Sequence, residues 1–298
     1  MPQFSIIILT WNSEEFIKNC LKSIFSTKGS IDLELIVVDN ASEDGTVEII
    51  KEFGPEVRLI FNRKNLGYAK GNNQGIEIAQ GEYILFLNPD VVLKENTLKL
   101  MLDFMDEHSE FGSTGEEIAG LGPQLLNIDG SIQPSCREFP GFSILFWEIT
   151  GLSYLFPKSR IFGRWRMGYF DFQSLKEVDQ PMGSCLLLRR KVLEKVGVFD
   201  ERFPIFFNDV DLCYKIKKNG EKLYFFPEAK AFHHKGGSTL KVKPKMVLSS
   251  HLSFFRFLNK YKKGFLNKIL VCFSGFILLL TALFRITFYI LRKVFSRN

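Results

Sequence analysis

Carboxylates and histidines follow apolar runs at several points of the sequence. Asp90 comes directly after ILFLNP at residues 84–89, and Asp209 follows an aromatic run at residues 203–207. His233 and His234 stand before a Gly-Gly pair. Carboxylate oxygens bind Mg²⁺ or Mn²⁺ together with a substrate diphosphate, and apolar walls raise the pKa of a carboxylate and make it a better base. The sequence therefore makes Asp90 and the histidine pair candidates for a metal site, and Asp209 a candidate general base.

Each of these residues also has a structural interpretation. An Asp at the end of a strand is commonly a turn former, and a histidine pair before Gly-Gly is commonly part of a loop. Asn208 or Asp209 could cap the helix that follows. The apolar setting of Asp209 favours the base, because a helix cap does not need such surroundings.

Two common phosphate-binding motifs are absent from the sequence. No GxGxxG follows the first apolar run, which weakens a dinucleotide-binding hypothesis, and no GxxxxGK[ST] exists, which excludes a P-loop NTPase. A divalent cation, Mg²⁺ or Mn²⁺, is therefore the predicted means of holding a substrate diphosphate.

Apolar runs that alternate with amphipathic segments must position these residues. Strands are predicted at residues 4–9, 33–38, 57–61 and 83–87, and helices at residues 13–25, 43–53 and 72–79. This alternation predicts an α/β fold with a Rossmann-like, mostly parallel sheet covered by helices on both faces. Ligands bind outside the carboxyl ends of such strands. The residues there are Thr10 to Asn12, Asp39 and Asn40, the loop 62–72, and Asn88 to Asp90.

The second half of the chain is less regular. Residues 94–105, 191–196 and 208–219 are predicted helices, residues 183–189 and 222–227 are predicted strands, and residues 107–122 are a predicted glycine-rich loop. Residues 123–180 mix Pro, Gly and aromatic residues without a clear period, so the sequence predicts no elements there.

Five ordered motifs of the sequence resemble those of the family 2 glycosyltransferases. They are TWN at residues 10–12, VDNASEDGT at 38–46, NLGYAKGN at 65–72, LNPD at 87–90 and FFNDVD at 206–211. The match spans residues 4–240 and is closest to the bacterial rhamnosyltransferase-like branch. The resemblance implies a GT-A fold, a nucleotide-diphospho-sugar donor and inversion at the anomeric carbon.

The resemblance also assigns roles by position. Thr10 and Asn12 would line the nucleotide pocket, Asp39 would bind the base, Asp90 and His233 would hold the metal, and Asp209 would be the catalytic base. The donor site would be completed by Asn40, Gly67, Lys70, Asn72 and Asn88.

Two residues depart from the family pattern. Asn88 replaces the first carboxylate of the DxD motif, which leaves fewer charged metal ligands, and Asn208 replaces the Glu that usually precedes the base. Two alternative functions remain open at this point. One is a polyprenyl-phosphate sugar synthase, in which a lipid phosphate attacks and needs no base. The other is a non-catalytic nucleotide-sugar-binding protein.

Charge divides the 298-residue chain into two parts. Twelve of the 39 lysines and arginines follow Thr239, where there is no Asp or Glu, so residues 1–240 carry 27 basic against 33 acidic residues. We therefore expect a catalytic domain at residues 1–240 and a basic, apolar, membrane-associating tail at residues 241–298. The sequence begins without a basic region or cleavage site, so the body is expected to stay in the cytoplasm.

The tail contains sixteen uncharged residues at 269–284, followed by Arg285. A bilayer span needs about 20 apolar residues, and an Arg near one end can snorkel. A helix lying in the interface of an anionic membrane is favoured over a single span, and both are favoured over a buried core helix. The apolar content argues against nucleic-acid binding. The sequence thus predicts an inverting glycosyltransferase at the cytoplasmic face of the membrane, with a lipid-linked glycan acceptor.

Overall fold

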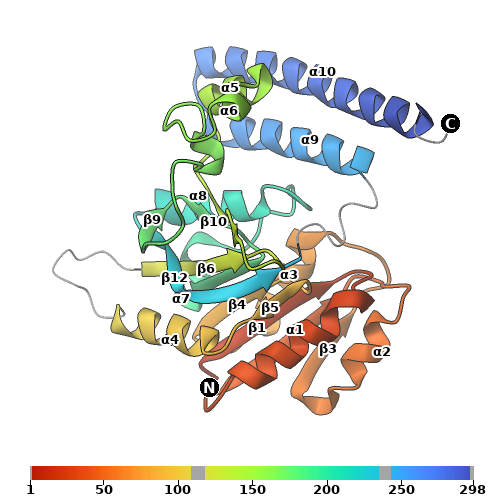
Figure 1. Cartoon of the computed structure of the whole chain (residues 1–298), viewed down its shortest axis with the longest axis vertical. Helices are drawn as coiled ribbons and strands as arrows, with labels where there is room; N and C mark the ends of the chain where they lie inside the picture. The colour runs from red at the N-terminus through yellow and green to blue at the C-terminus, as the bar shows by residue number, and fades with distance from the viewer. Residues whose placement is uncertain (1, 109–117, 235–242, 296–298) are drawn as a thin grey trace.

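The computed structural model describes residues 2–108, 118–234 and 243–295 (Figure 1). Within these ranges ten strands form one sheet, and β8 pairs with β10 in a second, small sheet. The strands are β1 (Phe4–Thr10), β2 (Leu33–Asp39), β3 (Val57–Phe61), β4 (Tyr83–Leu87), β5 (Val91–Leu93), β6 (Ile118–Leu126), β7 (Ile132–Gln133), β8 (Cys136–Arg137), β9 (Lys176–Val178), β10 (Gln180–Pro181), β11 (Cys185–Arg189) and β12 (Lys222–His233). The helices are α1 (Glu14–Thr27), α2 (Thr46–Lys51), η1 (Gly54–Glu56), α3 (Tyr68–Ile78), α4 (Thr97–Glu107), α5 (Phe142–Thr150), α6 (Leu152–Leu155), η2 (Arg164–Arg166), α7 (Arg190–Val196), α8 (Asn208–Lys218), α9 (Lys243–Tyr261) and α10 (Phe265–Phe295).

The sheet is parallel in its first half and mixed in its second half. Its order is β3-β2-β1-β4-β11-β6-β12-β5, and the pairs among β3, β2, β1 and β4 are parallel. Strand β11 runs antiparallel to both β4 and β6, and β5 runs antiparallel to β12. The α/β fold with helices on both faces is confirmed, and the reversed strands make the complete sheet mixed.

Helices cover both faces of the sheet, which explains why its strands are apolar at almost every position. Alternate residues of β1 enter different cores: Ile6 and Ile8 pack with α1, α2 and α4, whereas Ile7 packs with α3, α7 and α8. All three isoleucines are fully buried. The period of two along the strand therefore feeds two separate hydrophobic cores.

The predicted loop at residues 107–122 is wrong at its end. Residues 118–122 belong to β6, whose nine residues are all buried, and residues 109–117 lie outside the described residues. Gly120 of this strand is required by packing, because a Cβ there would collide with the Leu187 carbonyl oxygen of β11. The segment that the sequence left without elements, residues 123–180, contains the end of β6, then β7, β8, α5, α6, η2 and β9, and the first residue of β10.

The two C-terminal helices α9 and α10 lie with α5 and α6 at the end of the molecule opposite the N-terminus (Figure 1). Phe254, Phe257 and Leu258 of α9 share a buried cluster with Phe207 and Val210 at the start of α8. The fully buried carboxylate of Asp211 accepts hydrogen bonds from Lys260 Nζ (2.6 Å) and Tyr261 Oη (2.8 Å). Helix α9 is therefore packed tightly against the α/β body.

Candidate active site

The carboxyl ends of β1 and β2 meet at one edge of the sheet, because Thr10 is paired with Asp39 in the parallel register. The Asp39 carboxylate is buried and accepts hydrogen bonds from Thr10 Oγ1 (2.9 Å), Ser42 Oγ (2.6 Å) and the Ser42 backbone N–H (2.9 Å). Asn12 supports the same loop, since its Oδ1 accepts a hydrogen bond from the Glu43 N–H (2.8 Å). These predicted donor-site residues form one preorganised network.

Asn40 connects that network to the next loop. Its Oδ1 accepts a hydrogen bond from Asn62 Nδ2 (2.9 Å), and its Nδ2 donates to the Gly67 carbonyl (3.2 Å). Gly67 begins α3 with φ 84°, and a Cβ there would lie 2.8 Å from the Pro204 carbonyl oxygen. Only glycine accepts this backbone conformation so close to the loop that precedes Asp209.

Two predicted donor-site residues on α3 point elsewhere. Asn72 is buried and its Nδ2 donates to the Tyr68 carbonyl of its own helix (2.9 Å). Lys70 is exposed, and its Nζ lies 3.6 Å from Glu201 Oε2. The structure therefore places Asn40 and Gly67 in the hydrogen-bond network that includes Asp39, and shows no contact of Lys70 or Asn72 with it among the described residues.

Strand pairing brings Asp90 and His233 together, because His233 lies opposite Val91 in the β12–β5 pair. His233 Nδ1–H donates to Gln133 Oε1 (2.6 Å), and Gln133 Nε2 donates to Asn127 Oδ1 and to the His233 carbonyl. In the neutral imidazole this network leaves the lone pair on His233 Nε2, which lies 3.5 Å from Asp90 Oδ1. Asp90 Oδ1 is itself buried and has no hydrogen-bond partner in the described part of the chain.

These two acceptor atoms form a donor set that fits a divalent cation. Two lone pairs that face each other in a buried place are stabilised by a positive charge between them, and a ligating histidine usually donates its other N–H to an oriented partner, as His233 does to Gln133. The described residues hold no group of three or more His, Cys, Asp or Glu side chains suited to a metal. Substrate oxygens and water would therefore complete the coordination, as is usual for Mg²⁺.

Asp209 lies in the first turn of α8 and is held by three donors. Gln180 Nε2 (2.9 Å) and the Gly183 N–H (3.1 Å) donate to its Oδ2, and the Val210 N–H (2.9 Å) donates to its Oδ1. Burial raises the pKa of Asp209, and the backbone N–H groups oppose that rise in part. The side chain is only half-buried, so a substrate can reach it. Because the Val210 N–H belongs to the first turn of α8, Asp209 also satisfies a helix-start N–H, and this structural role is compatible with that of a base.

The antiparallel strand β11 connects the two carboxylates. The Asn88 N–H donates to the Ser184 carbonyl (2.8 Å), and the neighbouring Gly183 N–H donates to Asp209. Tyr68 Oη donates to the Gly183 carbonyl (2.9 Å), and burial, Asp209 and then Asp90 raise the pKa of Tyr68. The Tyr68 side chain therefore lies near both carboxylates, at the same sheet edge.

Several residues of the site could not be found from sequence. Gln133 and Gln180 lie in the segment without periodicity, and Gly183 stands two residues before β11. Arg137 of β8 also belongs here: burial lowers its pKa, and it interacts electrostatically with Asp209. Tyr68 alone could have been found from the sequence, because it belongs to the NLGY motif at residues 65–68.

Solved structures define the class of protein to which this site belongs. A mannosyltransferase of Pyrobaculum calidifontis with GDP-Man and Mn²⁺ matches with a TM-score of 0.57 and 17% identity, over 94% of this chain and 73% of that chain. Residues 1–349 of Staphylococcus aureus TarS with UDP-GlcNAc match with a TM-score of 0.54 and 20% identity, over 84% of this chain and 65% of that one. The fold is therefore the GT-A fold of glycosyltransferases.

The sequence comparison then gives the family. Residues 5–197 match the model described as glycosyl transferase family 2, so the chain belongs to that family of glycosyltransferases. A similar curated protein is the N-acetylglucosaminyl-diphospho-decaprenol L-rhamnosyltransferase of Mycobacterium tuberculosis, 29% identical over 87% of this chain and 85% of its own length. Another is the low-salt glycan biosynthesis hexosyltransferase Agl10 of Haloferax volcanii, 27% identical over 73% of this chain and 62% of its own.

Proposed function

We propose that this glycosyltransferase moves a sugar, with inversion, from a nucleotide-diphospho-sugar to a hydroxyl group of a lipid-linked glycan, in the synthesis of a cell-surface polysaccharide. The Mycobacterium tuberculosis relative is named for rhamnosyl transfer to a sugar on a lipid diphosphate. Its match over most of both chains supports a rhamnosyl donor and a lipid-linked acceptor of the same kind.

The position of Asp209 is the observation that carries this proposal. Inversion needs one base that takes the proton of the acceptor hydroxyl while its oxygen forms a bond to C1 of the sugar. The bond from C1 to the diphosphate breaks, and the nucleoside diphosphate leaves with the electron pair. Gln180 and Gly183 fix the Asp209 carboxylate by hydrogen bonds to Oδ2, and burial gives it the raised pKa that suits a base.

The donor is proposed to bind along the sheet edge that Asp39 and Asn40 form. A nucleoside would lie against the Thr10–Asp39–Ser42 network, and its diphosphate would extend toward Asp90. Asp90 and His233 would hold Mg²⁺ or Mn²⁺ there. When bound, such a cation neutralises the charge that develops on the leaving diphosphate.

The proposed location is the cytoplasmic face of the cell membrane, with α10 as the element that binds an anionic lipid surface. Residues 265–291 of α10 contain an 18-residue stretch with mean hydropathy 2.4, of which only 22% is buried, so the length and composition of the helix suffice to cross a bilayer. A helix lying in the interface and a single span both remain compatible with these properties.

The test is product identification. Full-length protein in membranes would be incubated with a nucleotide-diphospho-rhamnose, UDP-GlcNAc or GDP-Man, and with GlcNAc-diphospho-prenol as acceptor. We expect one added sugar by mass spectrometry, with inverted anomeric configuration by NMR. Retention of configuration would contradict the role of Asp209.

The same assay separates the proposal from a polyprenyl-phosphate sugar synthase. A polyprenyl phosphate is already ionised and needs no base, so transfer to it would survive Asp209→Asn. Transfer to a sugar hydroxyl should fall by about 10²–10⁴-fold, the usual contribution of a general base. Transfer that is retained in this variant, with polyprenyl-phosphate sugar as its product, would replace our proposal.

A further inference from the structure

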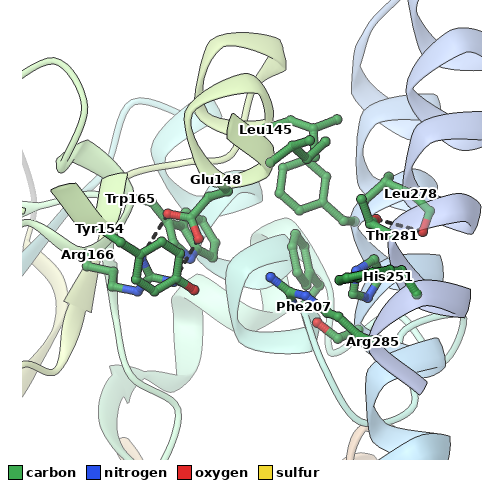
Figure 2. Close-up of a pocket in the computed structure, with 14 residues that line it drawn as sticks. Leu145, Glu148, Tyr154, Trp165, Arg166, Phe207, His251, Leu278, Thr281 and Arg285 are labelled. Carbon is green, nitrogen blue, oxygen red and sulfur yellow. Dashed lines mark hydrogen bonds and ion pairs between the residues drawn. The ribbon is translucent and has the colours of Figure 1, made fainter. Parts of the chain in front are cut away.

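A second pocket lies outside the donor site, between α5, α6 and η2 on one side and α9 and α10 on the other (Figure 2). Its volume is about 410 Å³, within the range of about 300–1,000 Å³ that is typical of small-molecule sites. Its inner wall is apolar and buried, and consists of Leu145, Phe207, Phe254 and Leu278.

An arginine side chain stands on each side of this apolar wall. On one side Arg166 forms two hydrogen bonds with Glu148 (2.9 and 2.7 Å) and packs over the Tyr154 ring, with Cζ 4.5 Å from its centroid. On the other side lie His251 and Arg285 (Figure 2). Among the described residues no ion pair to Arg285 occurs, so the pocket carries more positive than negative charge.

One wall of the pocket is close along the chain to the proposed base. Phe207 lines the pocket and precedes Asp209 by two residues, a stretch of chain that spans at most about 7 Å. Arg137 interacts electrostatically with Asp209 on one side and with Arg166 and Glu148 on the other. A ligand in the pocket can therefore present a group attached to its charged end to Asp209.

The outer rim of the pocket is apolar and exposed. Tyr154 is 59% exposed and Phe284 is 72% exposed. Further large apolar side chains are exposed on the same three helices α5, α6 and α10, namely Phe146, Ile149, Leu155, Phe276, Leu280, Leu283 and Phe288. A long apolar chain that leaves the pocket would pass directly onto this uncovered surface.

We propose that this pocket binds the isoprenoid diphosphate portion of the lipid-linked acceptor. The first isoprene units lie against Leu145, Phe254 and Leu278, the diphosphate is bound by Arg285 and Arg166, and the attached sugar reaches Asp209. The inference rests on the proposed function for the identity of the acceptor. It adds the site at which the lipid part is recognised.

Isothermal titration calorimetry on the full-length protein, in one detergent throughout, tests the site without catalysis. Three probes are compared: farnesyl diphosphate, farnesol and inorganic diphosphate. We expect farnesyl diphosphate to bind at least tenfold more tightly than either of the others. Arg285→Met should weaken the binding of farnesyl diphosphate about tenfold or more, which is the effect of losing one charge-assisted hydrogen bond. It should leave the affinity for farnesol unchanged.

Thr281→Trp would fill the pocket and should abolish binding of farnesyl diphosphate and farnesol alike. The matched control is Lys268→Ala, because Lys268 is an exposed cation of the same helix outside the pocket. This variant should bind each of the three probes with the affinity of the wild type. UDP-GlcNAc or GDP-Man, whichever binds the wild type, should bind all three variants equally, which shows that the donor site remains folded.

The outcomes distinguish this inference from the proposed function. If farnesyl diphosphate does not bind, or if Lys268→Ala weakens it as much as Arg285→Met, the pocket assignment is wrong even when sugar transfer is observed. If phosphatidylglycerol displaces farnesyl diphosphate with equal affinity, the pocket is a general lipid site and the assignment is also wrong. If the probe binds as expected but no hydroxyl acceptor is glycosylated, the pocket stands and the proposed function fails.

Discussion

The Asp209 carboxylate combines fixed orientation with partial exposure. Its three hydrogen-bond donors come from α8, from β10 and from Gly183, two residues before β11. Two of the donors are backbone N–H groups, which have one orientation once the strands have paired. Such a base needs little reorganisation when the acceptor loses its proton.

The pH dependence of the reaction tests this environment. Since burial raises the pKa of Asp209, the base becomes protonated, and therefore inactive, at a higher pH than an ordinary Asp of pKa about 3.9. We expect kcat/KM to fall as the pH is lowered through that raised pKa, while donor affinity measured by calorimetry stays constant over the same range. An acid limb that lies at or below the pKa of an ordinary Asp would contradict the effect of burial.

Gln133 is expected to act on the metal through His233. Its Oε1 accepts the Nδ1–H of His233 and thereby keeps the Nε2 lone pair directed at Asp90. Gln133→Leu should raise the Mn²⁺ concentration needed for half-maximal donor binding about 10–100-fold, the usual effect of losing such a partner. Asp90→Ala should abolish metal-dependent donor binding.

Two controls show whether the changed Mn²⁺ requirement arises at the metal site. Asn127→Ala removes the other side-chain partner of Gln133 and should change the Mn²⁺ requirement much less. Donor binding without metal should be the same in all variants. If Asp90→Ala leaves the Mn²⁺ dependence unchanged, Asp90 is not a metal ligand.

Among the secondary-structure elements, β11 joins the two halves of the sheet and depends on one buried arginine. Arg189 ends the strand and is 2% exposed. Its guanidinium donates to the Ile118 carbonyl of β6 (2.9 Å), the Tyr83 hydroxyl of β4 (3.0 Å) and the Met105 carbonyl of α4 (2.5 Å). One side chain therefore connects three elements around β11, the strand that follows Gly183.

Replacing Arg189 should strongly reduce the stability of the protein. Arg189→Met would leave two buried carbonyl groups and a buried hydroxyl without their donor, at about 1–3 kcal/mol each, so we expect a loss of at least about 3 kcal/mol in the free energy of unfolding. Urea unfolding measures it. The neighbouring Arg190 is the control, because among the described residues its side chain makes only a long ion pair with Glu194 (3.8 Å) on the surface. Arg190→Met should stay within about 0.5 kcal/mol of wild type; equal effects of the two variants would contradict the anchoring role.

At the scale of the whole molecule, two cores of the α/β body hold the donor site and a third cluster joins that body to α9 and α10. The polar edge of the sheet and the uncovered apolar surface of α5, α6 and α10 are thus parts of one packed structure. A membrane-bound acceptor and a soluble donor can reach neighbouring regions of the same protein.

Membrane binding by that surface can be measured directly. Phe273 (61% exposed) and Leu280 (49% exposed) of α10 would enter the lipid, and burying each such side chain contributes about 1.5–3 kcal/mol. Phe273→Glu with Leu280→Glu should therefore reduce binding to phosphatidylglycerol vesicles at least tenfold in a sedimentation assay. The matched control places the same charges at Phe61 (53% exposed) and Ile128 (57% exposed), which lie outside α5, α6 and α10.

The control variant should bind vesicles like wild type, and both variants should bind donor normally. High salt should weaken wild-type binding in part, since exposed charges are screened within about 10 Å at 0.1 M. If the α10 variant sediments with vesicles as well as the control does, another surface of the protein binds the membrane.

The sequence by itself determined the elements whose pattern is local. Strands β1 to β4 and helices α1 and α8 follow from apolar runs and periods that a few neighbouring residues define, and Asp39, Asp90 and Asp209 follow from motifs of similar length. Their chemistry could be anticipated because the residue type and its position after a strand are written in the chain. The resemblance of these motifs to a family supplied the fold and the enzyme class.

Only the tertiary structure decided how the remaining residues take part. Gln133 meets His233 one hundred residues away, Gln180 meets Asp209, and Arg189 reaches three elements. Each of these contacts depends on strand order and register, which are set by the packing of the entire sheet and leave no local pattern. Gly120 shows the same limit, because a glycine that β11 requires through close contact looks in sequence like a glycine of a loop.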